Sequence, residues 1–279
     1  MEKRGQEAGK KRRWRRILPA VLALLIVPGL DARLRVREYT VETGVLTQPV
    51  RLALVTDLHS CRYGEGEKTL LDALDAQAPD AVLLGGDIFD DVLDDDNTEA
   101  FLAGISGRYP VYYVTGNHEY WNGVYPQKME CLSRYEITRL AGSREVLSLP
   151  GGELTVCGVD DPECYTTGQR DGFEEQLAAV TPQGEGYTVL LSHRPERFAD
   201  YTDAGFDLVL CGHAHGGQWR IPGLLNGLWA PDQGFFPKLA GGVYTQGDTT
   251  MIVSRGLARE STRIPRLYDP PELVIVTLT

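Results

Sequence analysis

The chain has 279 residues, of which 42% are hydrophobic, and a formal net charge of −11. This composition is ordinary for a globular protein with a substantial core, so it excludes a largely disordered chain. The charge is unevenly distributed: residues 1–16 contain eight Lys or Arg against two Glu, and the remaining chain, with 20 basic and 37 acidic residues, carries −17. A body this acidic repels a phosphate backbone, so we expect no nucleic-acid partner, sequence-specific or general.

The basic residues 1–16 lead directly into an apolar stretch, ILPAVLALLIVPGL, at residues 17–30. These 14 residues are fewer than the roughly 20 that a spanning helix needs and fit the core of a signal peptide. No convincing A-x-A cleavage site follows, which favours an uncleaved N-terminal anchor helix over a removed signal peptide. A buried structural helix is disfavoured by the flanking positive charge, and Arg15-Arg16 also permits twin-arginine export.

The charge asymmetry predicts an orientation for this segment. By the positive-inside rule, residues 1–16 are cytoplasmic and the body from about residue 40 lies on the far side of the membrane. We therefore expect a protein of the cell membrane with a single N-terminal pass and an extracytoplasmic main domain. In this division, residues 17–30 are the membrane anchor or signal segment, residues 31–49 a linker and first strand region, and residues 50–279 the main domain.

From residue 50 onward, short apolar runs alternate with segments of helical character. We expect strands at 50–56, 81–86 and 111–116, with helices after them at 67–77, 97–108 and 126–135. This βαβαβ pattern predicts neighbouring strands in a largely parallel sheet with helices on its faces.

The second half of the chain is richer in strands. Strands are expected at 145–149, 153–159, 187–192, 206–212, 249–256 and 272–279, and helical segments at 171–180 and 195–205. This number of strands fits two packed sheets, covered by helices on the outside, better than one open sheet.

Two loop segments and the cysteines allow further expectations. The acidic segment 90–97, DDVLDDDN, is interpreted as a solvated approach to a helix whose N-cap is Asn97. Segment 219–240 is rich in Trp, Leu and Phe, and a buried crossover packed on the sheet is favoured over an apolar wall for a lipid-like substrate. The five cysteines include no CxxC pair, so we expect buried free thiols rather than a disulfide framework, with Cys157 and Cys211 inside strands.

All five histidines, with several acidic and amide side chains, follow the ends of apolar runs. The candidates are Asp57 and His59, then Asp87, then Asn117, His118 and Glu119, then His193, and finally His213 and His215. The carboxyl ends of strands in α/β sheets are where ligand sites form. If the backbone is extended, the one-residue gap in each Asp57/His59 and His213/His215 pair puts both side chains on one face.

The candidate set combines carboxylates, an amide and imidazoles, with no thiolate close by. This chemistry suits Mn, Fe or Zn better than an all-oxygen calcium site or a cysteine-rich structural zinc. The seven candidate ligands are Asp57, His59, Asp87, Asn117, His193, His213 and His215. One ion needs fewer ligands than this, so we expect two divalent metal ions bridged by a carboxylate such as Asp87.

Five sequence blocks occur in the order TDLH, GGD, GNHE, SHRPE and GHAHGGQ. Together they resemble the signature of the calcineurin-like metallophosphoesterases. The end of the chain resembles that of a small membrane-anchored bacterial phosphodiesterase branch of this family, so the resemblance covers about four fifths of the sequence. It implies an α/β fold, a four-layer α/β/β/α sandwich of two mixed sheets, here preceded by the N-terminal apolar anchor helix.

The resemblance also implies a role for each candidate. It assigns Asp57, His59, Asp87 and His215 to one metal ion, and Asp87, Asn117, His193 and His213 to the other. His118 would be the catalytic histidine that faces the phosphate. The sequence departs from the usual pattern of the signature at two positions: Ala214 stands where Thr is common, and Glu119 where Asp is common. Neither change removes a ligand.

The expected function is hydrolysis of a phosphodiester, pyrophosphate or phosphomonoester bond through attack of a metal-bridging hydroxide. His118 would protonate the leaving oxygen or stabilise its charge, and Glu119 would either orient His118 or be a surface carboxylate. The substrate is expected at a membrane surface, and a lipid-linked phosphate ester is one candidate. Two alternatives are less favoured. A catalytically silent metal-binding scaffold would be expected to have lost some ligands, whereas all seven are present here. A metal-dependent amidohydrolase would account for the His-x-His pair but not for the GGD and GNHE blocks.

Overall fold

The computed structural model describes residues 19, 23, 24, 26–167, 172–184, 186–259, 261 and 264–279. In this part of the chain, no helix has the length and apolar character needed to cross a membrane. The anchor helix expected at 17–30 is therefore not found. Residues 1–18, 20–22 and 25 lie outside the described residues, and the end of the apolar stretch forms the short 3-10 helix η1 (Val27–Leu30).

The first sheet has six strands in the spatial order β1-β14-β2-β3-β4-β5. Its strands are β1 (Arg35–Val41), β2 (Val50–Val55), β3 (Ala81–Gly85), β4 (Val111–Val114), β5 (Thr138–Arg139) and β14 (Glu272–Leu278). The strands β2, β3, β4 and β5 run parallel, whereas β14 is antiparallel to β2 and parallel to β1. The strands predicted at 50–56, 81–86 and 111–116 are confirmed. Their continuous apolar runs reflect burial on both faces, as expected for a parallel sheet.

The second sheet also has six strands, in the order β12-β13-β9-β8-β7-β6. They are β6 (Ser143–Leu149), β7 (Gly152–Gly158), β8 (Tyr187–Leu191), β9 (Leu208–Cys211), β12 (Gly242–Gln246) and β13 (Thr249–Val253). The central strands β7, β8, β9 and β13 are parallel, and the two edge strands are antiparallel to their neighbours. The expectation of two mixed sheets is therefore confirmed.

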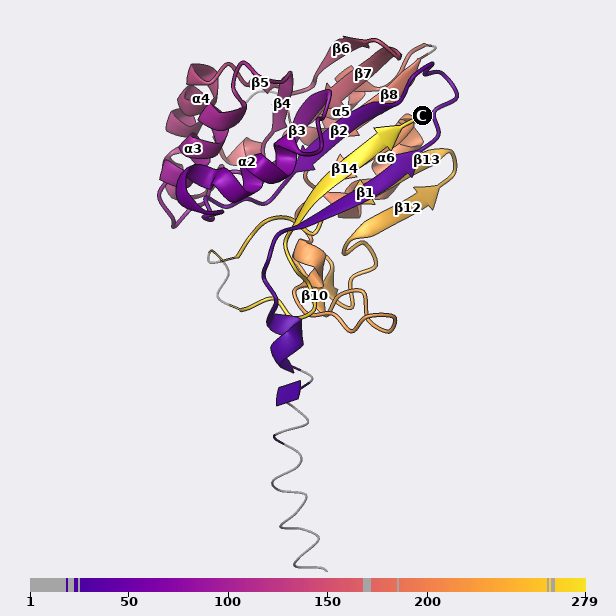
Figure 1. Cartoon of the computed structure of the whole chain (residues 1–279). Helices are drawn as coiled ribbons and strands as arrows, with labels where there is room; N and C mark the ends of the chain where they lie inside the picture. The colour runs from indigo at the N-terminus through magenta and orange to yellow at the C-terminus, as the bar shows by residue number, and fades with distance from the viewer. Residues whose placement is uncertain are drawn as a thin grey trace, which may run out of the picture.

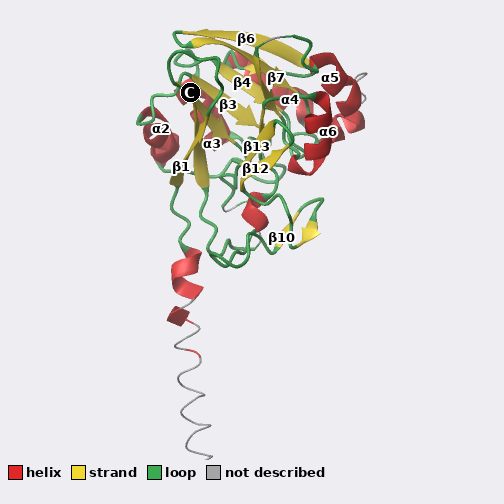
Figure 2. Ribbon diagram, turned by 90° about the vertical axis from the view of Figure 1, so that its right-hand side faces the viewer, coloured by secondary structure: helices red, strands yellow, loops and turns green. Residues whose placement is uncertain are grey.

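Helices cover the outer face of each sheet (Figures 1 and 2). Helices α2 (Lys68–Asp75), α3 (Asp96–Ile105) and α4 (Tyr125–Arg134) share a buried apolar cluster with the first sheet, and α5 (Phe173–Val180) and α6 (Phe198–Ala204) share one with the second. A third cluster joins the two sheets face to face, with Leu54 and Leu83 on one side and Val189 and Leu210 on the other. The layers are thus α, β, β and α.

Two local predictions have different outcomes. The N-cap prediction for Asn97 is wrong, because α3 begins at Asp96 and the Asn97 side-chain amide donates a hydrogen bond to the Ser60 carbonyl at 3.0 Å. The prediction for the cysteines is confirmed, since all five are free and buried. The extra edge strand β12 was not predicted, because its sequence GVYTQ lacks a continuous apolar run.

Candidate functional site

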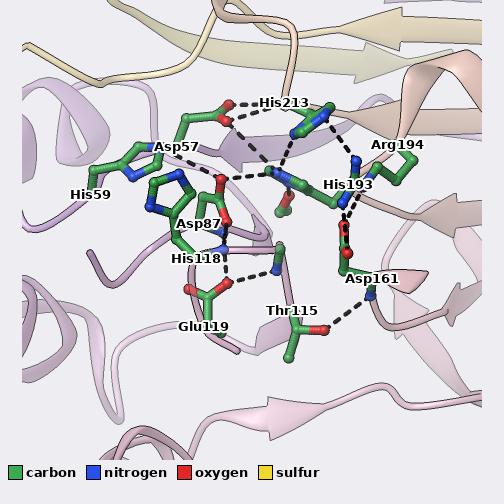
Figure 3. Close-up of polar contacts among 12 residues, drawn as sticks. Asp57, His59, Asp87, Thr115, His118, Glu119, Asp161, His193, Arg194 and His213 are labelled. Carbon is green, nitrogen blue, oxygen red and sulfur yellow. Dashed lines mark hydrogen bonds and ion pairs between the residues drawn. The ribbon is translucent and has the colours of Figure 1, made fainter. Parts of the chain in front are cut away.

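The candidate residues from both sheets meet at one edge of the molecule, where the parallel strands end (Figure 3). Among the described residues, four groups of side chains have potential ligand atoms within 4.8 Å of one another, and two of these groups consist of predicted ligands alone. The first is Asp57, His59, Asp87 and His215, and the second is Asp87, His193 and His213. Asp87 belongs to both groups. The structure therefore brings together six of the seven candidate ligands around a shared carboxylate.

The distances place Asp87 between the two groups. Its Oδ2 atom lies 3.1 Å from His193 Nε2 and 3.5 Å from His59 Nε2. On the other side, Asp57 Oδ1 lies 3.8 Å from His215 Nε2 and 4.0 Å from His193 Nε2. These side chains are almost fully buried, so their charges act in an environment of low polarisability.

The seventh candidate, Asn117, lines the same cavity, which has a volume of about 260 Å³. Its amide oxygen is buried and has no hydrogen-bond partner in the described part of the chain, and the same is true of His59 Nε2, Asp87 Oδ2 and His215 Nδ1. Buried polar atoms are normally paired, so these four atoms of candidate ligands need a partner. Two divalent cations with nitrogen and oxygen ligands satisfy them, and the residues present fit such a centre.

The loops that carry these residues turn sharply after each strand. Asp57, His59, Asp87, His213 and His215 all have positive φ angles, between 45° and 67°. The Asp-x-His and His-x-His segments are therefore not extended, and the condition under which an extended backbone would put each pair on one face is not met. Left-handed backbone at such residues costs on the order of 1–3 kcal/mol each and concentrates at functional sites.

A glycine at the end of β4 allows the close approach of two of these loops. A Cβ atom on Gly116 would lie 2.2 Å from Asp87 Oδ1 and 2.6 Å from the Asp87 backbone nitrogen. Any side chain at this position would displace the carboxylate shared by the two groups. The glycine in the GNHE block thus has a steric role in addition to its place in the turn.

Hydrogen bonds at the far side of the imidazoles fix which ring nitrogen faces the cavity. His193 Nδ1 donates to the Gly85 carbonyl at 2.8 Å, and His59 Nδ1 donates to Asp90 Oδ1 at 3.0 Å. Because each donating nitrogen keeps its proton, Nε2 is the atom of each ring that faces Asp87 and that a metal ion would bind. This is the tautomer that a metal ligand requires.

His213 uses the opposite arrangement. Its Nε2 atom lies 2.8 Å from Asp232 Oδ2, and its Nδ1 atom faces His193 Nε2 at 3.2 Å. Asp232 is also paired with Arg194, whose other partner is the buried Asp161. The carboxylate of Asp232 therefore holds the His213 proton on Nε2 and leaves Nδ1 toward His193, and the pKa of Asp232 is lowered to about 2, chiefly by this hydrogen bond.

His118 lies beside the two groups and lines the cavity. Its Nδ1 atom lies 2.7 Å from Asp91 Oδ1, and its ring packs on Trp121 with the centroids 4.2 Å apart. Burial lowers the pKa of His118, while the negative charges of Asp87 and Asp91 oppose this shift. The arrangement leaves Nε2 as the atom that can act on a bound molecule.

Sequence reasoning missed several residues of this site. Asp90 and Asp91 contact His59 and His118, so the interpretation of 90–97 as a solvated approach to a helix is wrong for its first two residues. The only sequence signal was their position, three and four residues after Asp87. Nothing local pointed to Asp161 or Asp232, whose partners are distant in sequence.

Glu119 has neither of its expected roles. It is fully buried, and its carboxylate accepts hydrogen bonds from the backbone N–H groups of Asp87, Ile88, Phe89 and Gly116. Burial, together with the charge of Asp87, raises the pKa of Glu119 to about 7. Glu119 thus ties the loop after β3 to the loop after β4, and Asp91 rather than Glu119 orients His118.

The segment 219–240 is not a buried crossover. It contains the short strands β10 (Trp229–Ala230) and β11 (Gly234–Phe235), and several of its large apolar side chains reach the surface. Leu224 is 82% exposed and Phe235 is 72% exposed. The favoured interpretation of this segment is therefore wrong.

Comparison with known proteins agrees with this site. The sequence model of the calcineurin-like phosphoesterases matches residues 50–217. An uncharacterized metallophosphoesterase of Aquifex aeolicus is 29% identical over 252 residues, which are 88% of this chain and 92% of the relative. Phosphodiesterase YaeI of Escherichia coli is 27% identical over 237 residues, with 82% of each chain covered.

Other relatives are longer than this chain. An uncharacterized metallophosphoesterase of Helicobacter pylori is 28% identical over 195 residues, which are 67% of this chain but 50% of that relative. Among solved structures, the NAD nucleotidase NadN of Haemophilus influenzae superposes with a TM-score of 0.53 at 15% identity, over 76% of this chain and 46% of that one. This likeness shows the fold alone. The family match over residues 50–217 and the cluster at the strand ends lead to one conclusion: the chain belongs to the calcineurin-like phosphoesterase family.

Proposed function

We propose that the protein is a dinuclear metal-dependent hydrolase of phosphodiester or pyrophosphate bonds, with phosphomonoesters as less favoured substrates. The observation that carries this proposal is the sharing of Asp87 by two ligand groups in a cavity that His118 also lines. The name of the relative YaeI, a phosphodiesterase, supports the choice of a diester.

The ligand assignment follows the two groups. Asp57, His59, Asp87 and His215 are proposed to hold one ion, and Asp87, Asn117, His193 and His213 the other, with Mn as the first candidate metal and Fe or Zn as alternatives. When bound, two such ions supply an activated water and neutralise charge on phosphoryl oxygens. Asp90 and Asp232 would keep the imidazoles of His59 and His213 in the required tautomers.

His118 is the proposed proton donor to the leaving oxygen. The Asp91 carboxylate accepts the Nδ1 proton at 2.7 Å and stabilises the imidazolium form, which burial alone would disfavour. Arg194, which lines the same cavity and is held by Asp161 and Asp232, is placed to contact a phosphoryl oxygen.

The proposed location is the outer side of a cell membrane, with the protein held by its N-terminal segment. The basic residues 1–16 followed by the apolar residues 17–30 support a single pass with the main domain outside the cytoplasm. This placement would bring the site close to lipid headgroups and favours a lipid-linked phosphate ester as substrate.

The direct test uses the full-length chain in a mild detergent, with bis-p-nitrophenyl phosphate and added Mn²⁺. We expect turnover that EDTA abolishes, with p-nitrophenyl phosphate hydrolysed more slowly. Asp87→Asn should lower activity by at least about 100-fold. Asp94 is an exposed residue of the acidic segment 90–97, and Asp94→Asn should retain wild-type activity. Metal binding without turnover under any divalent metal would instead favour the catalytically silent scaffold.

A further inference from the structure

Beside the metal cavity lies a second, apolar cavity with a volume of about 420 Å³. Its lining residues are Gly217, Gln218, Trp219, Leu228, Trp229, Phe235 and Ile264. Six of the seven are glycine, aliphatic or aromatic. The volume falls in the range of small-molecule sites, which are typically about 300–1,000 Å³.

The lining offers few hydrogen-bond groups to a polar ligand. The indole N–H of Trp219 already donates to the Pro265 carbonyl at 2.9 Å, so it is not available. The Gln218 amide and the Trp229 indole N–H are the remaining side-chain hydrogen-bond groups of the lining. A nucleobase carries several donors and acceptors that would stay unpaired here, which costs affinity, whereas a hydrocarbon chain needs none.

Two features connect this cavity to the metal cavity. Trp229 lines both cavities, so its side chain forms part of the wall between them. Gly217 belongs to the 3-10 helix η6 (His215–Gly217), which begins with one of the candidate metal ligands. Asp232, in the turn between β10 and β11, bonds His213 in the metal cavity, while Phe235 of β11 lines the apolar one.

The apolar cavity also lies at the end of the molecule from which the N-terminal segment extends. In Figures 1 and 2, β10 and the η1 region are at the same end. Residues 264–268 connect them, because Ile264 lines the cavity and the Tyr268 backbone N–H donates to the Gly29 carbonyl at 2.6 Å. The exposed side chains of Leu224 and Phe236 lie in the same segment as the cavity.

From these observations we propose that the apolar cavity holds the alkyl chain of an amphiphilic phosphate ester whose phosphorus lies in the adjoining metal cavity. This inference rests on the proposed function and adds the site that would bind the hydrocarbon chain of a lipid-linked phosphate ester. Trp229 lines both cavities, so the two lie side by side and one molecule that extends past Trp229 would reach both. Burial of the chain would then contribute to recognition in proportion to its length.

The test measures binding of a series of alkylphosphonates, from methyl to octyl, to the full-length chain below the concentration at which they form micelles. Trp219 and Trp229 line the cavity, so tryptophan fluorescence reports occupancy. We expect affinity to rise about fourfold for each methylene that enters the cavity. The gain in affinity per methylene should be the same with Mn²⁺ and with EDTA, because the metal ions would contact the phosphonate group and not the alkyl chain.

A matched pair of variants locates the binding. In Phe235→Ser, the gain in affinity per methylene should fall, and Phe235→Leu should restore most of it. Leu224→Ser, an exposed residue of the same segment that does not line the cavity, should keep the wild-type slope. Three results would overturn the inference. The first is an affinity of the wild type that does not change with chain length, and the second is an equal loss of the gain per methylene in Leu224→Ser. The third is tighter binding of adenosine monophosphate than of octylphosphonate.

A second series, of alkyl p-nitrophenyl phosphates, separates this inference from the proposed function. Hydrolysis of methyl p-nitrophenyl phosphate tests the enzyme, and the dependence of kcat/KM on chain length in longer alkyl p-nitrophenyl phosphates tests the cavity. If no ester is hydrolysed but the slope in binding persists, the proposed function fails and the cavity assignment stands. If methyl and octyl esters react equally and bind equally, the cavity assignment fails alone.

Discussion

The Nδ1 atom of His118 lies 2.7 Å from Asp91 Oδ1, and the two residues follow different strands of the first sheet. The carboxylate orients the imidazole and leaves Nε2 facing the cavity. Trp121 packs on the ring and holds it from the other side, with the centroids 4.2 Å apart. The orientation of His118, the proposed proton donor, is thus held by Asp91 and Trp121, which belong to neither group of candidate metal ligands.

Replacing Asp91 by Asn should therefore impair proton donation and leave the metal ligands in place. We expect Asp91→Asn to lower kcat on bis-p-nitrophenyl phosphate by about 10–100-fold, with little change in KM or in bound metal. The alkaline limb of the pH profile should also move to lower pH, because the imidazolium loses its stabilising charge and the pKa of His118 falls. Asp94→Asn is the matched control, and equal kcat values for the two variants would refute the role of Asp91.

Asp232 should affect metal affinity, since its carboxylate accepts a hydrogen bond from His213 Nε2 at 2.8 Å and so leaves Nδ1 as the atom that would bind a metal ion. We expect Asp232→Asn to bind Mn²⁺ about 10–100-fold more weakly, as measured by titration calorimetry. Asp248→Asn, an exposed carboxylate between β12 and β13, serves as the control. Wild-type affinity in Asp232→Asn would show that the hydrogen bond does not position His213.

Metal removal should destabilise the protein. Asp57 and Asp87 are buried at the same edge of the sheets, and bound cations neutralise their charges in the folded state alone. At a free metal concentration 100 times Kd, each site contributes about 2.7 kcal/mol to the free energy of unfolding. Urea unfolding with Mn²⁺ and with EDTA measures this difference. Asp87→Asn should show a smaller difference, and identical midpoints for the wild type would contradict the prediction.

The thiols should be unreactive until the protein unfolds. All five cysteines are buried, and burial raises the pKa of Cys131 and Cys157 to about 11, so thiolate is scarce at pH 8. We expect Ellman's reagent to detect five thiols in guanidinium chloride and to react slowly with the native chain. Rapid reaction of one thiol in the native state, or fewer than five in denaturant, would contradict this description.

Much of the fold could be predicted because its central strands are buried on both faces. The continuous apolar runs of β2, β3 and β8 read directly as strands, and the polar residue after each run marks the edge where ligands gather. The edge strand β12 could not be predicted in this way, because it is exposed and its residues are mixed in character.

The surroundings of the site were less predictable, since they depend on contacts between distant loops. The pairing of His213 with Asp232 is set by the hairpin β10–β11, which folds back on the site after β9. The left-handed conformation of Asp57 and Asp87 is also imposed by tertiary structure, because their residue types alone do not require it. Glu119 illustrates the same limit: its four backbone partners belong to two loops that meet only in the folded chain.

The measurement that tests the central claim most directly is the anomalous scattering of crystals of the full-length chain grown with Mn²⁺. We expect two anomalous-difference peaks about 3.5–4 Å apart, one on either side of Asp87. One should lie among Asp57, His59 and His215, and the other among Asn117, His193 and His213. A single peak, or two peaks away from Asp87, would contradict the dinuclear centre on which the proposed function depends.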